Sequence, residues 1–551
     1  MSAELTSADL AAIEAETQTI GRHLFANLAD TRPRIWNRRW WDDRMMAWSM
    51  QDESLKVQLF RFVDVLPMLG SADSVTEHLQ EYLATVQDKL PMAVRVALGV
   101  ARRTPFTRAA VARAARLSAQ DFARRFIAGE NARQVLRAAK NERQLHRGFT
   151  LDILGEAVIS NSEAEQYFHA YLDLLAAITP EVQSWPADAL IDQDARGPIP
   201  RVNLSVKLSA LDSQFDPLDH DGTTRRAGGR LKELFRAARR LGAFINVDME
   251  SYDKKDLTLH IFQTVLGEPE FRDWTDVGIV IQCYLEDAAA DLINLRDWAQ
   301  ARGTPVWVRL VKGAYWDYET IKAKSHGWPI PVFQKKWQSD ANFENSTRFV
   351  LQNSPHLRCA LGSHNLRSIA HGIATARHLE LPPSAYELQM LYGMADAEKQ
   401  ALVDLGQRLR IYMPYGDLIP GMAYLVRRLL ENTSNDSFLR AGFVDKVPPE
   451  VLLQDPKEVG RASSLPKETI DIDQKPTPSR SEPMSTTHPS FTNQPPVDFA
   501  RAENRQAMFE ALAIVKGRMG RDCPLIIGGQ SVETAEKMQS HDPSLRSRFV
   551  G

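Results

Sequence analysis

Residues 305–313 read PVWVRLVKG, a short run of β-branched and apolar residues that ends in a cation and a glycine. Seven more segments of this kind occur between residues 148 and 440, and helical stretches separate them. The eight segments are GFTLDILG (148–155), VNLSVKLSA (202–210), FINVDME (244–250), VGIVIQCY (277–284), PVWVRLVKG (305–313), LRCALGSHN (357–365), YELQMLYG (386–393) and LRIYMPYG (409–416). Strands that alternate with helices indicate parallel βαβ units, and eight strands in about 290 residues predict an α/β chain with a closed (β/α)8 TIM barrel.

A doubly wound open sheet is the alternative arrangement of such units. It would usually place a glycine-rich turn for a dinucleotide after one of the strands. No GxGxxG motif occurs in the chain. The barrel is therefore the favoured prediction.

The rest of the chain divides by composition. Residues 1–147 show helical periodicity with few β-branched runs and are predicted to form a helical region before the barrel, which we place at 148–445. Residues 446–500 are rich in proline, serine and threonine, which predicts a linker. Residues 501–551 begin with a helical stretch, and we expect them to open a further domain that is cut short.

The overall composition is that of an ordinary globular protein, with 44% hydrophobic and 25% charged residues and a formal net charge of −3. That charge gives no overall attraction to nucleic acid, although residues 95–147 are locally basic. Cys283, Cys359 and Cys523 are too scattered for a disulfide framework or a zinc site. A basic leader and a run of about eighteen apolar residues are both absent, which favours a cytoplasmic protein without a membrane span.

Polar residues close the apolar segments, at the ends where a barrel of this type carries its catalytic groups. They are Asp152, Glu156, Lys207, Asp248, Glu250, Gln282, Arg309, Lys312, His364, Asn365 and Tyr412. Any one of them has an equally good structural explanation, because loops need polar residues and barrels need satisfied ion pairs. Together they predict a site at the carboxyl end of the barrel.

Arg309 is expected to face the barrel interior if its neighbours Val308 and Leu310 face outward. A buried guanidinium must find an anion or a polar ring, and FAD offers both a ring rich in acceptors and a pyrophosphate within reach of Lys312. The alternative is a structural ion pair between Arg309 and Asp248.

A pair of arginines follows the last segment, in AYLVRRLLEN. Glu431 lies four residues after Arg427 and three after Arg428, so one carboxylate can hold either guanidinium on the same helix surface. Paired arginines suit a substrate that carries a carboxylate. A surface helix with salt bridges is the alternative interpretation.

The motifs VNLSVKLSAL, INVDMES, IVIQCY, VRLVKGAYWD, GSHN, YELQMLYGM, RIYMPYG and AYLVRRLLEN occur in this order and closely resemble the proline dehydrogenase domain of the proline utilization A family. The resemblance covers about residues 150 to 440, and more weakly the helical region before it. It implies a distorted (β/α)8 barrel that binds FAD without a covalent link.

The resemblance also implies roles for single residues. Arg309 would lie near flavin N5, Lys207 would bind the proline carboxylate, Asp248 would pair with that cluster, and these three form the catalytic set. The substrate site would comprise Lys207, Leu391, Tyr412, Tyr424, Arg427 and Arg428. The cofactor site would comprise Val247, Gln282, Arg309, Lys312, Gly313, Ala314, Ser363, His364, Asn365 and Glu431, and no metal is expected. Relatives that prefer hydroxyproline have a smaller residue in place of Tyr412, so this tyrosine favours proline.

The implied reaction is hydride transfer from C5 of L-proline to FAD, giving pyrroline-5-carboxylate, with a membrane quinone as electron acceptor. This is the first step of proline catabolism to glutamate. Peripheral membrane contact and a homodimer are compatible with it. No ribbon-helix-helix DNA-binding module is discernible, and the last residues resemble the start of an aldehyde dehydrogenase half without its NAD site or nucleophilic cysteine.

Two other interpretations of the sequence stay open. Lys207 and Lys312 at strand ends are also compatible with a Schiff-base lyase or aldolase. A helical binding module with an inactive barrel would be no enzyme at all.

Overall fold

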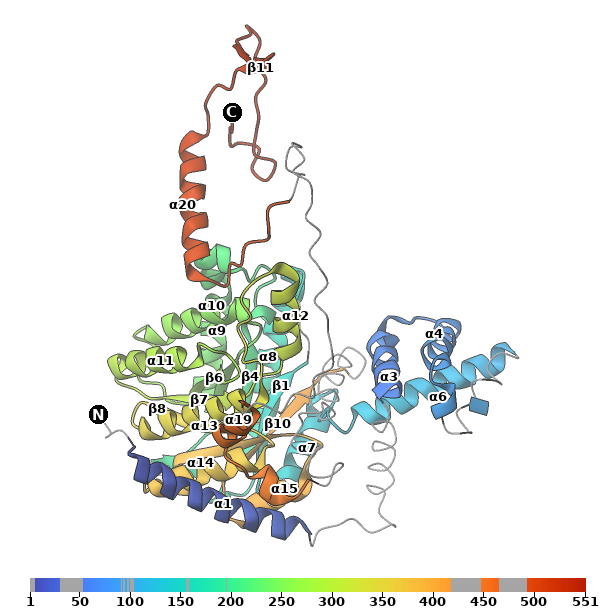
Figure 1. Ribbon diagram of the computed structural model, residues 1–551, viewed down its shortest axis with the longest axis vertical. Coiled ribbons are helices and arrows are strands. Elements are labelled where there is room, and N and C mark those ends of the chain that lie inside the picture. Colours follow the sequence, from blue (N-terminus) through green and yellow to red (C-terminus); the bar gives the residue numbers. More distant parts are fainter. Residues whose placement is uncertain are drawn as a thin grey trace, which may run out of the picture.

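A closed barrel of eight parallel strands forms the centre of the computed structural model (Figure 1). The structure describes residues 5–29, 53–90, 92, 95–96, 99, 104–154, 158–194, 196–417, 447–464 and 493–551. The barrel strands are β1 (Gly148–Ile153), β4 (Asn203–Lys207), β5 (Phe244–Asp248), β6 (Val277–Gln282), β7 (Val306–Val311), β8 (Leu357–Gly362), β9 (Tyr386–Leu391) and β10 (Leu409–Tyr415). The order β1-β10-β9-β8-β7-β6-β5-β4 closes because β1 also pairs with β4. The predicted (β/α)8 class and all eight strands are confirmed.

Helices follow the strands and surround the barrel (Figure 1). They are α8 (Asn161–Gln183), α9 (His220–Leu241), α10 (Tyr252–Gly267), α11 (Ala288–Arg302), α12 (Trp316–His326), α13 (Lys336–Gln352), α14 (Leu366–His378) and α15 (Asp396–Asp404). The described residues also form five short 3₁₀ helices, η1 (Leu66–Met68), η2 (Gln87–Lys89), η3 (Leu208–Ala210), η4 (Pro217–Asp219) and η5 (Pro383–Ala385). The sequence did not reveal the small hairpin of β2 (Gln193–Asp194) and β3 (Gly197–Pro198), which precedes β4.

The strands alternate between an apolar outer face and a polar inner face. On β7, Val308 and Leu310 are fully buried in the core beneath the helices, whereas Arg309 points across the barrel interior. TIM-barrel interiors are usually filled by bulky branched residues. This interior instead holds the buried polar residues Thr150, Asp152, Asn203, Ser205, Lys207, Asn246, Asp248, Gln282, Gln389 and Arg410.

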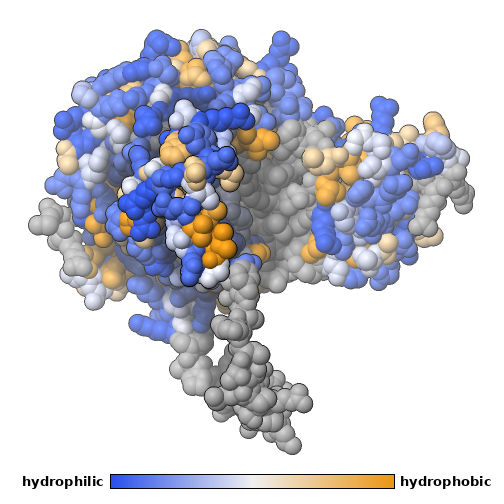
Figure 2. Space-filling view, turned by 90° about the horizontal axis from the view of Figure 1, so that it is seen from above, coloured by the Kyte–Doolittle hydropathy of each residue, from blue (hydrophilic) through white to orange (hydrophobic). Residues whose placement is uncertain are grey.

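A group of helices lies beside the barrel, at the right of Figure 1. It contains α3 (Glu53–Val65), α4 (Ala72–Ala84) and α6 (Pro105–Ala123), which pack on one another. Figure 2, seen from above, shows hydrophobic residues on its surface, and Met68 and Phe106 are both more than four-fifths exposed.

The chain then returns to the barrel at the carboxyl end of β10. The Ala128 amide donates to the carbonyl of Pro414 over 2.8 Å. Gly393 has a φ of +79°, and a Cβ there would lie 1.9 Å from the Arg125 carbonyl oxygen, so this close approach requires glycine. From here α7 (Ala132–Gln144) leads into β1.

The first helix, α1 (Ser7–Ala29), packs along α14 on the outside of the barrel. Arg367 is 2% exposed, and its guanidinium donates to Glu14 of α1, to Glu344 of α13 and to the Leu453 carbonyl. Leu453 follows α18 (Pro449–Leu452) and precedes α19 (Pro456–Ser464), and α19 packs on α13. The first part of the segment assigned to a linker is therefore helical and attached to the barrel.

The last described segment, 493–551, projects away from the barrel (Figure 1). It contains α20 (Ala502–Arg518) and the hairpin of β11 (Leu525–Ile527) and β12 (Gln530–Val532), and none of their residues is buried. The boundaries of the four predicted domains stay a prediction. Across the described part of the chain, no helix has the length and apolar character needed to cross a bilayer.

We predict that Arg367→Met lowers the free energy of unfolding by about 3 kcal/mol, because it leaves the buried Glu344 carboxylate without its main partner. The control is Arg377→Met on the same helix. Arg377 pairs with Glu16 of α1 at an exposed position, so its loss should cost less than about 1 kcal/mol. Equal effects on chemical denaturation would contradict the docking role of Arg367.

Candidate active site

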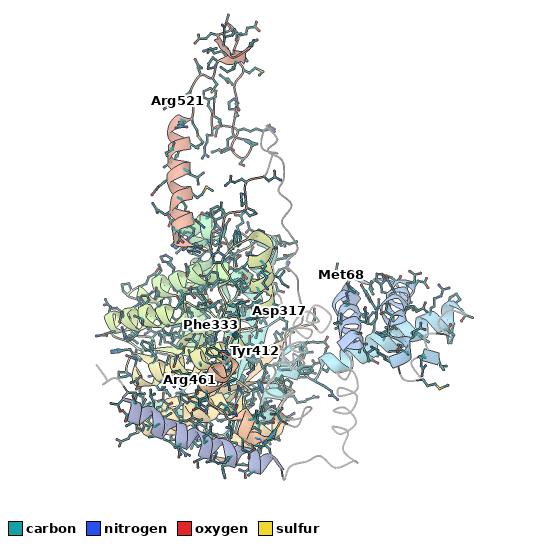
Figure 3. The ribbon with its side chains drawn as sticks, in the orientation of Figure 1. Met68, Asp317, Phe333, Tyr412, Arg461 and Arg521 are labelled. Carbon is teal, nitrogen blue, oxygen red and sulfur yellow. The ribbon has the colours of Figure 1, made fainter. Side chains whose placement is uncertain are left out.

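Arg309 and Asp248 form a buried ion pair inside the barrel. Arg309 Nη1 lies 2.7 Å from Asp248 Oδ1, and Nη2 donates to Ser205 Oγ over 3.1 Å. The Tyr412 hydroxyl donates to the other carboxylate oxygen over 2.8 Å, and its ring centroid lies 5.2 Å from the guanidinium carbon. Tyr412 lies within the body of the barrel (Figure 3). Strands β4, β5, β7 and β10 thus converge on one cluster.

An ion pair between Arg309 and Asp248 is the structural alternative to a cofactor contact that the sequence left open. However, Arg309 Nε is buried with no hydrogen-bond partner among the described residues, so the pair leaves a donor unsatisfied. A buried unpaired donor costs about 1–3 kcal/mol. The Arg309 Nε–H group is therefore placed to donate to a further acceptor.

Lys207 and Asp152 form a second buried pair beside the first. The Lys207 ammonium contacts the Asp152 carboxylate, and both side chains are less than a tenth exposed. Burial raises the pKa of Asp152, the Lys207 charge opposes that shift, and the nearby Asp248 carboxylate adds to it. Burial also raises the pKa of Tyr171, which lies behind this pair on α8. Lys207 therefore pairs with Asp152, whereas Asp248 pairs with Arg309.

The turn after β7 combines a close backbone approach at Gly313 with the cationic side chain of Lys312. Gly313 has a φ of +134°, and a Cβ there would lie 2.4 Å from the Tyr284 ring, so the backbone passes closer to this ring than any side chain allows. Lys312 contacts the Asp340 carboxylate of α13, which Lys336 also contacts over 2.6 Å. Burial lowers the pKa of Lys312 despite the attraction of Asp340.

The ends of β8 and β9 are held together by His364. The Leu391 amide donates to His364 Nε2 over 2.9 Å. Asn365 caps α14, since its side chain accepts from the Ser368 amide over 3.2 Å, and the Asn365 amide donates to Ser363 Oγ over 3.0 Å. These residues of two motifs are therefore neighbours on the same rim of the barrel.

Gln282 closes β6 and donates from Nε2 to the Glu250 carbonyl over 3.0 Å. Its Oε1 atom is buried and has no hydrogen-bond partner among the described residues. The Val247 side chain instead belongs to the outer hydrophobic core. Only the main chain of Val247 is left to contact a ligand in the barrel.

Some predicted residues lie outside the described part of the chain. They are Glu156, Tyr424, Arg427, Arg428 and Glu431. The others lie toward the carboxyl ends of β1 and β4 to β10. Contacts join Asp248, Arg309 and Tyr412 to one interior cluster, and Lys207 lies beside it in the register of β4 and β5, paired with Asp152. Ala314 follows Gly313 on the β7 rim.

The sequence assigned no role to three residues that complete these contacts. Ser205 precedes Lys207 by two positions, so the period of the strand could have placed it inside the barrel. Asp152 stands at a predicted strand end, but nothing in the sequence identifies its partner. Asp340 lies on a helix far along the chain, and no local pattern points to it.

The described residues contain no group of three or more His, Cys, Asp or Glu side chains placed to hold a metal ion. This finding covers only that part of the chain.

Comparisons with known proteins identify relatives of this chain. A family model of proline dehydrogenase matches residues 135–441, and a model of the proline utilization A N-terminal domain matches residues 14–126. Bifunctional protein PutA of Salmonella typhimurium is 30% identical over 364 residues, which are 64% of this chain and 26% of that protein. Proline dehydrogenase 1 of Bacillus subtilis is 27% identical over 324 residues, which are 59% of this chain and 91% of that protein.

A solved structure agrees with these relationships. The structure of proline utilization A from Bdellovibrio bacteriovorus inactivated by N-propargylglycine has a TM-score of 0.81 and 38% identity, and the match covers 98% of this chain and 52% of that one. The chain therefore spans about half the length of that solved relative. These relationships do not support the Schiff-base lyase or aldolase alternative.

We predict that Asp340 contributes stability only where it is ionised. Burial raises the pKa of this carboxyl, but Lys312 and Lys336 outweigh burial and hold it at about 2, below its ordinary 3.8. A lowered folded pKa stabilises the protein above pH 4, and that stability is lost as the pH falls toward 2. The free energy of unfolding of the wild type exceeds that of Asp340→Asn above pH 4. This difference should shrink by on the order of 2 kcal/mol as the pH falls toward 2. A constant difference would contradict the pairing.

Proposed function

The chain belongs to the proline dehydrogenase family, and on that premise we propose that it oxidises L-proline to pyrroline-5-carboxylate with FAD bound at the carboxyl end of the barrel. The observation that carries this proposal is the convergence of Lys207, Asp248, Arg309 and Tyr412 inside the barrel. Active sites of this fold lie at that end.

The residues present fit a flavin. Arg309 Nε and Gln282 Oε1 are a buried donor and a buried acceptor without partners among the described residues, and a flavin ring carries both acceptors and a donor. The close backbone turn at Gly313 and the cationic Lys312 suit a pyrophosphate. We expect His364 and Asn365 on the neighbouring rim to hold the rest of the cofactor.

The charges of the cluster indicate where a substrate carboxylate would bind. Within the described residues, the Lys207 and Arg309 cations are each matched by one carboxyl group, Asp152 and Asp248. A substrate carboxylate therefore needs further cations. Arg427 and Arg428 are the candidates, and bidentate guanidinium contacts would supply both charge and geometry.

When bound, FAD would supply the hydride acceptor for C5 of proline. The side chains of this chain would mainly orient the ring and exclude water. Tyr412 would pack against the pyrrolidine, and Leu391 with Tyr424 would wall the pocket. Asp248 would keep the Arg309 guanidinium directed at the reacting centre, and proline would enter with its amine unprotonated.

We further propose a membrane quinone as the final electron acceptor, with this reaction as the first step of proline catabolism to glutamate. Such an acceptor requires at least transient contact with a membrane surface.

Anaerobic addition of proline to the purified flavoprotein tests the function. The yellow colour of bound flavin should bleach, and a dye acceptor should restore it. A protein that binds FAD but is not reduced by proline would refute the proposed substrate. Borohydride trapping of a carbonyl compound on Lys207 or Lys312 would instead support the lysine-based alternative.

Arg428→Met is predicted to raise the KM for proline at least tenfold, roughly 1.4 kcal/mol, with FAD still bound, because a guanidinium partner of the carboxylate is lost. Arg133→Met is the control, since Arg133 is exposed on α7. An unchanged KM in the first variant would remove Arg428 from the substrate site.

A further inference from the structure

A second layer of polar side chains lies beneath the Arg309–Asp248 pair, toward the amino-terminal end of the barrel. Asn246 precedes Asp248 by two residues on β5 and therefore faces the same interior. Asn203 begins the neighbouring strand β4. Both asparagines are 3% exposed. Buried amides in a barrel interior must be satisfied, and their partners show what they support.

Asn246 is bonded to the catalytic layer above it. Its Nδ2 atom donates to Asp248 Oδ1 over 3.1 Å, and the same oxygen accepts Arg309 Nη1 over 2.7 Å. Tyr412 holds the other carboxylate oxygen over 2.8 Å. The Asp248 carboxylate is thus fixed by donors from three directions, and Asn246 is the one that approaches from below.

Asn203 differs in this respect. Its Oδ1 accepts from Thr150 Oγ1 over 2.8 Å, and Thr150 lies 3.2 Å from Ser205 Oγ. Asn203 therefore reaches Arg309 only through two hydroxyl groups, which can rotate to other partners. The two asparagines have the same side chain and burial but different connections to the ion pair.

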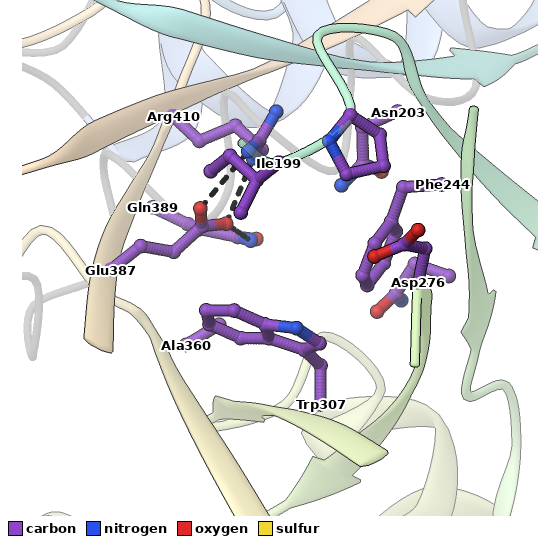
Figure 4. A pocket seen from close by; sticks show the side chains of 11 residues that line it. Ile199, Asn203, Phe244, Asp276, Trp307, Ala360, Glu387, Gln389 and Arg410 are labelled. Carbon is purple, nitrogen blue, oxygen red and sulfur yellow. Dashed lines mark hydrogen bonds and ion pairs between the residues drawn. The ribbon is translucent and has the colours of Figure 1, made fainter. Parts of the chain in front are cut away.

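Both asparagines line a small cavity, which Figure 4 shows from close by. It has room for about one or two water molecules. Its lining includes Asn203, Asn246, Phe244, Trp307, Gln389 and Arg410. Gln389 Oε1 is buried with no hydrogen-bond partner among the described residues, so the lining of this cavity is partly polar. Asn246 thus contacts both this cavity and the ion pair.

Gly278 fixes where the Asn246 amide can lie. It pairs with Asn246 across β5 and β6, and a Cβ at position 278 would lie 2.7 Å from Asn246 Oδ1 and 3.0 Å from Trp307 Cβ. A larger residue would push the amide away from its present place. The lack of a side chain at Gly278 therefore leaves the space that the Asn246 amide occupies beside Asp248.

We propose that Asn246 is a positioning residue that holds the Asp248 carboxylate, and through it the Arg309 guanidinium, in the orientation that the oxidation of proline requires. The inference rests on the proposed function. Asn246 lies beneath the ion pair and away from the expected substrate carboxylate site. Its loss should therefore slow the chemical step more than it weakens substrate binding.

Asn246→Asp tests this directly. The charged and titratable groups that face Asp248 are Arg309 from β7, Tyr412 from β10, Lys207 from β4 and Asp152 from β1, with Tyr171 of α8 behind them. Asp276, Glu387 and Arg410 line the cavity on the other side of position 246. An ionised aspartate at 246 cannot donate to Asp248 and repels it, whereas a protonated one donates as the amide does.

The rate of flavin reduction by proline in Asn246→Asp should fall at least tenfold at pH 8, with the KM within threefold of wild type. The ratio of the wild-type rate to the variant rate should shrink as the pH falls toward 6, because protonation restores the donor. Asn246→Ala removes the donor without adding a charge, so its loss of rate should be independent of pH. A purely structural role would give no rescue by acid.

Asn203→Asp is the matched control and should stay within threefold of wild type throughout. In crystal structures of both variants without flavin at pH 8, Arg309 should be turned away from Asp248 in Asn246→Asp and still paired with it in Asn203→Asp. Wild-type rates in Asn246→Asp and Asn246→Ala, with the wild type itself reduced by proline, would overturn the inference. A wild type that proline does not reduce would instead refute the proposed function.

Discussion

The buried ion pair of Arg309 and Asp248 is the interaction on which the rest of the site depends. Two charges inside a barrel lose their hydration, and that cost is offset only where further hydrogen bonds satisfy them. Ser205, Asn246 and Tyr412 supply those bonds from three other positions. The pair is therefore surrounded by polar side chains that face the barrel interior.

The alternation of side chains along each strand explains how the sequence places these polar groups inside the barrel. Asn203, Ser205 and Lys207 alternate with apolar residues on β4, and Asn246 and Asp248 do so on β5. The parallel register places Lys207 beside Asp248. A shift of one residue would send every one of these groups to the hydrophobic side, so register and charge placement are a single constraint.

Much of the fold and part of the site could be predicted from the sequence. The eight strands are predictable because each is a short apolar run, and the inward direction of Arg309 follows from its alternation with Val308 and Leu310. The partner of Lys207 could not be predicted, because Asp152 and Asp248 stand at neighbouring strand ends and only the side-chain geometry chooses between them. The contacts of Asp340 and the attachment of residues 449–464 depend on packing between distant segments, which leaves no local pattern.

The central claim is that Arg309, whose Nε has no partner among the described residues, faces a flavin at the mouth of this barrel. A crystal structure of the protein loaded with FAD and a ring-oxygen analogue of proline tests it most directly, since the analogue has no amine to oxidise. The account predicts the isoalloxazine ring within hydrogen-bond distance of Arg309 and Gln282, with the analogue stacked near Tyr412. A cofactor bound elsewhere, or an Arg309 side chain that contacts neither molecule, would contradict it.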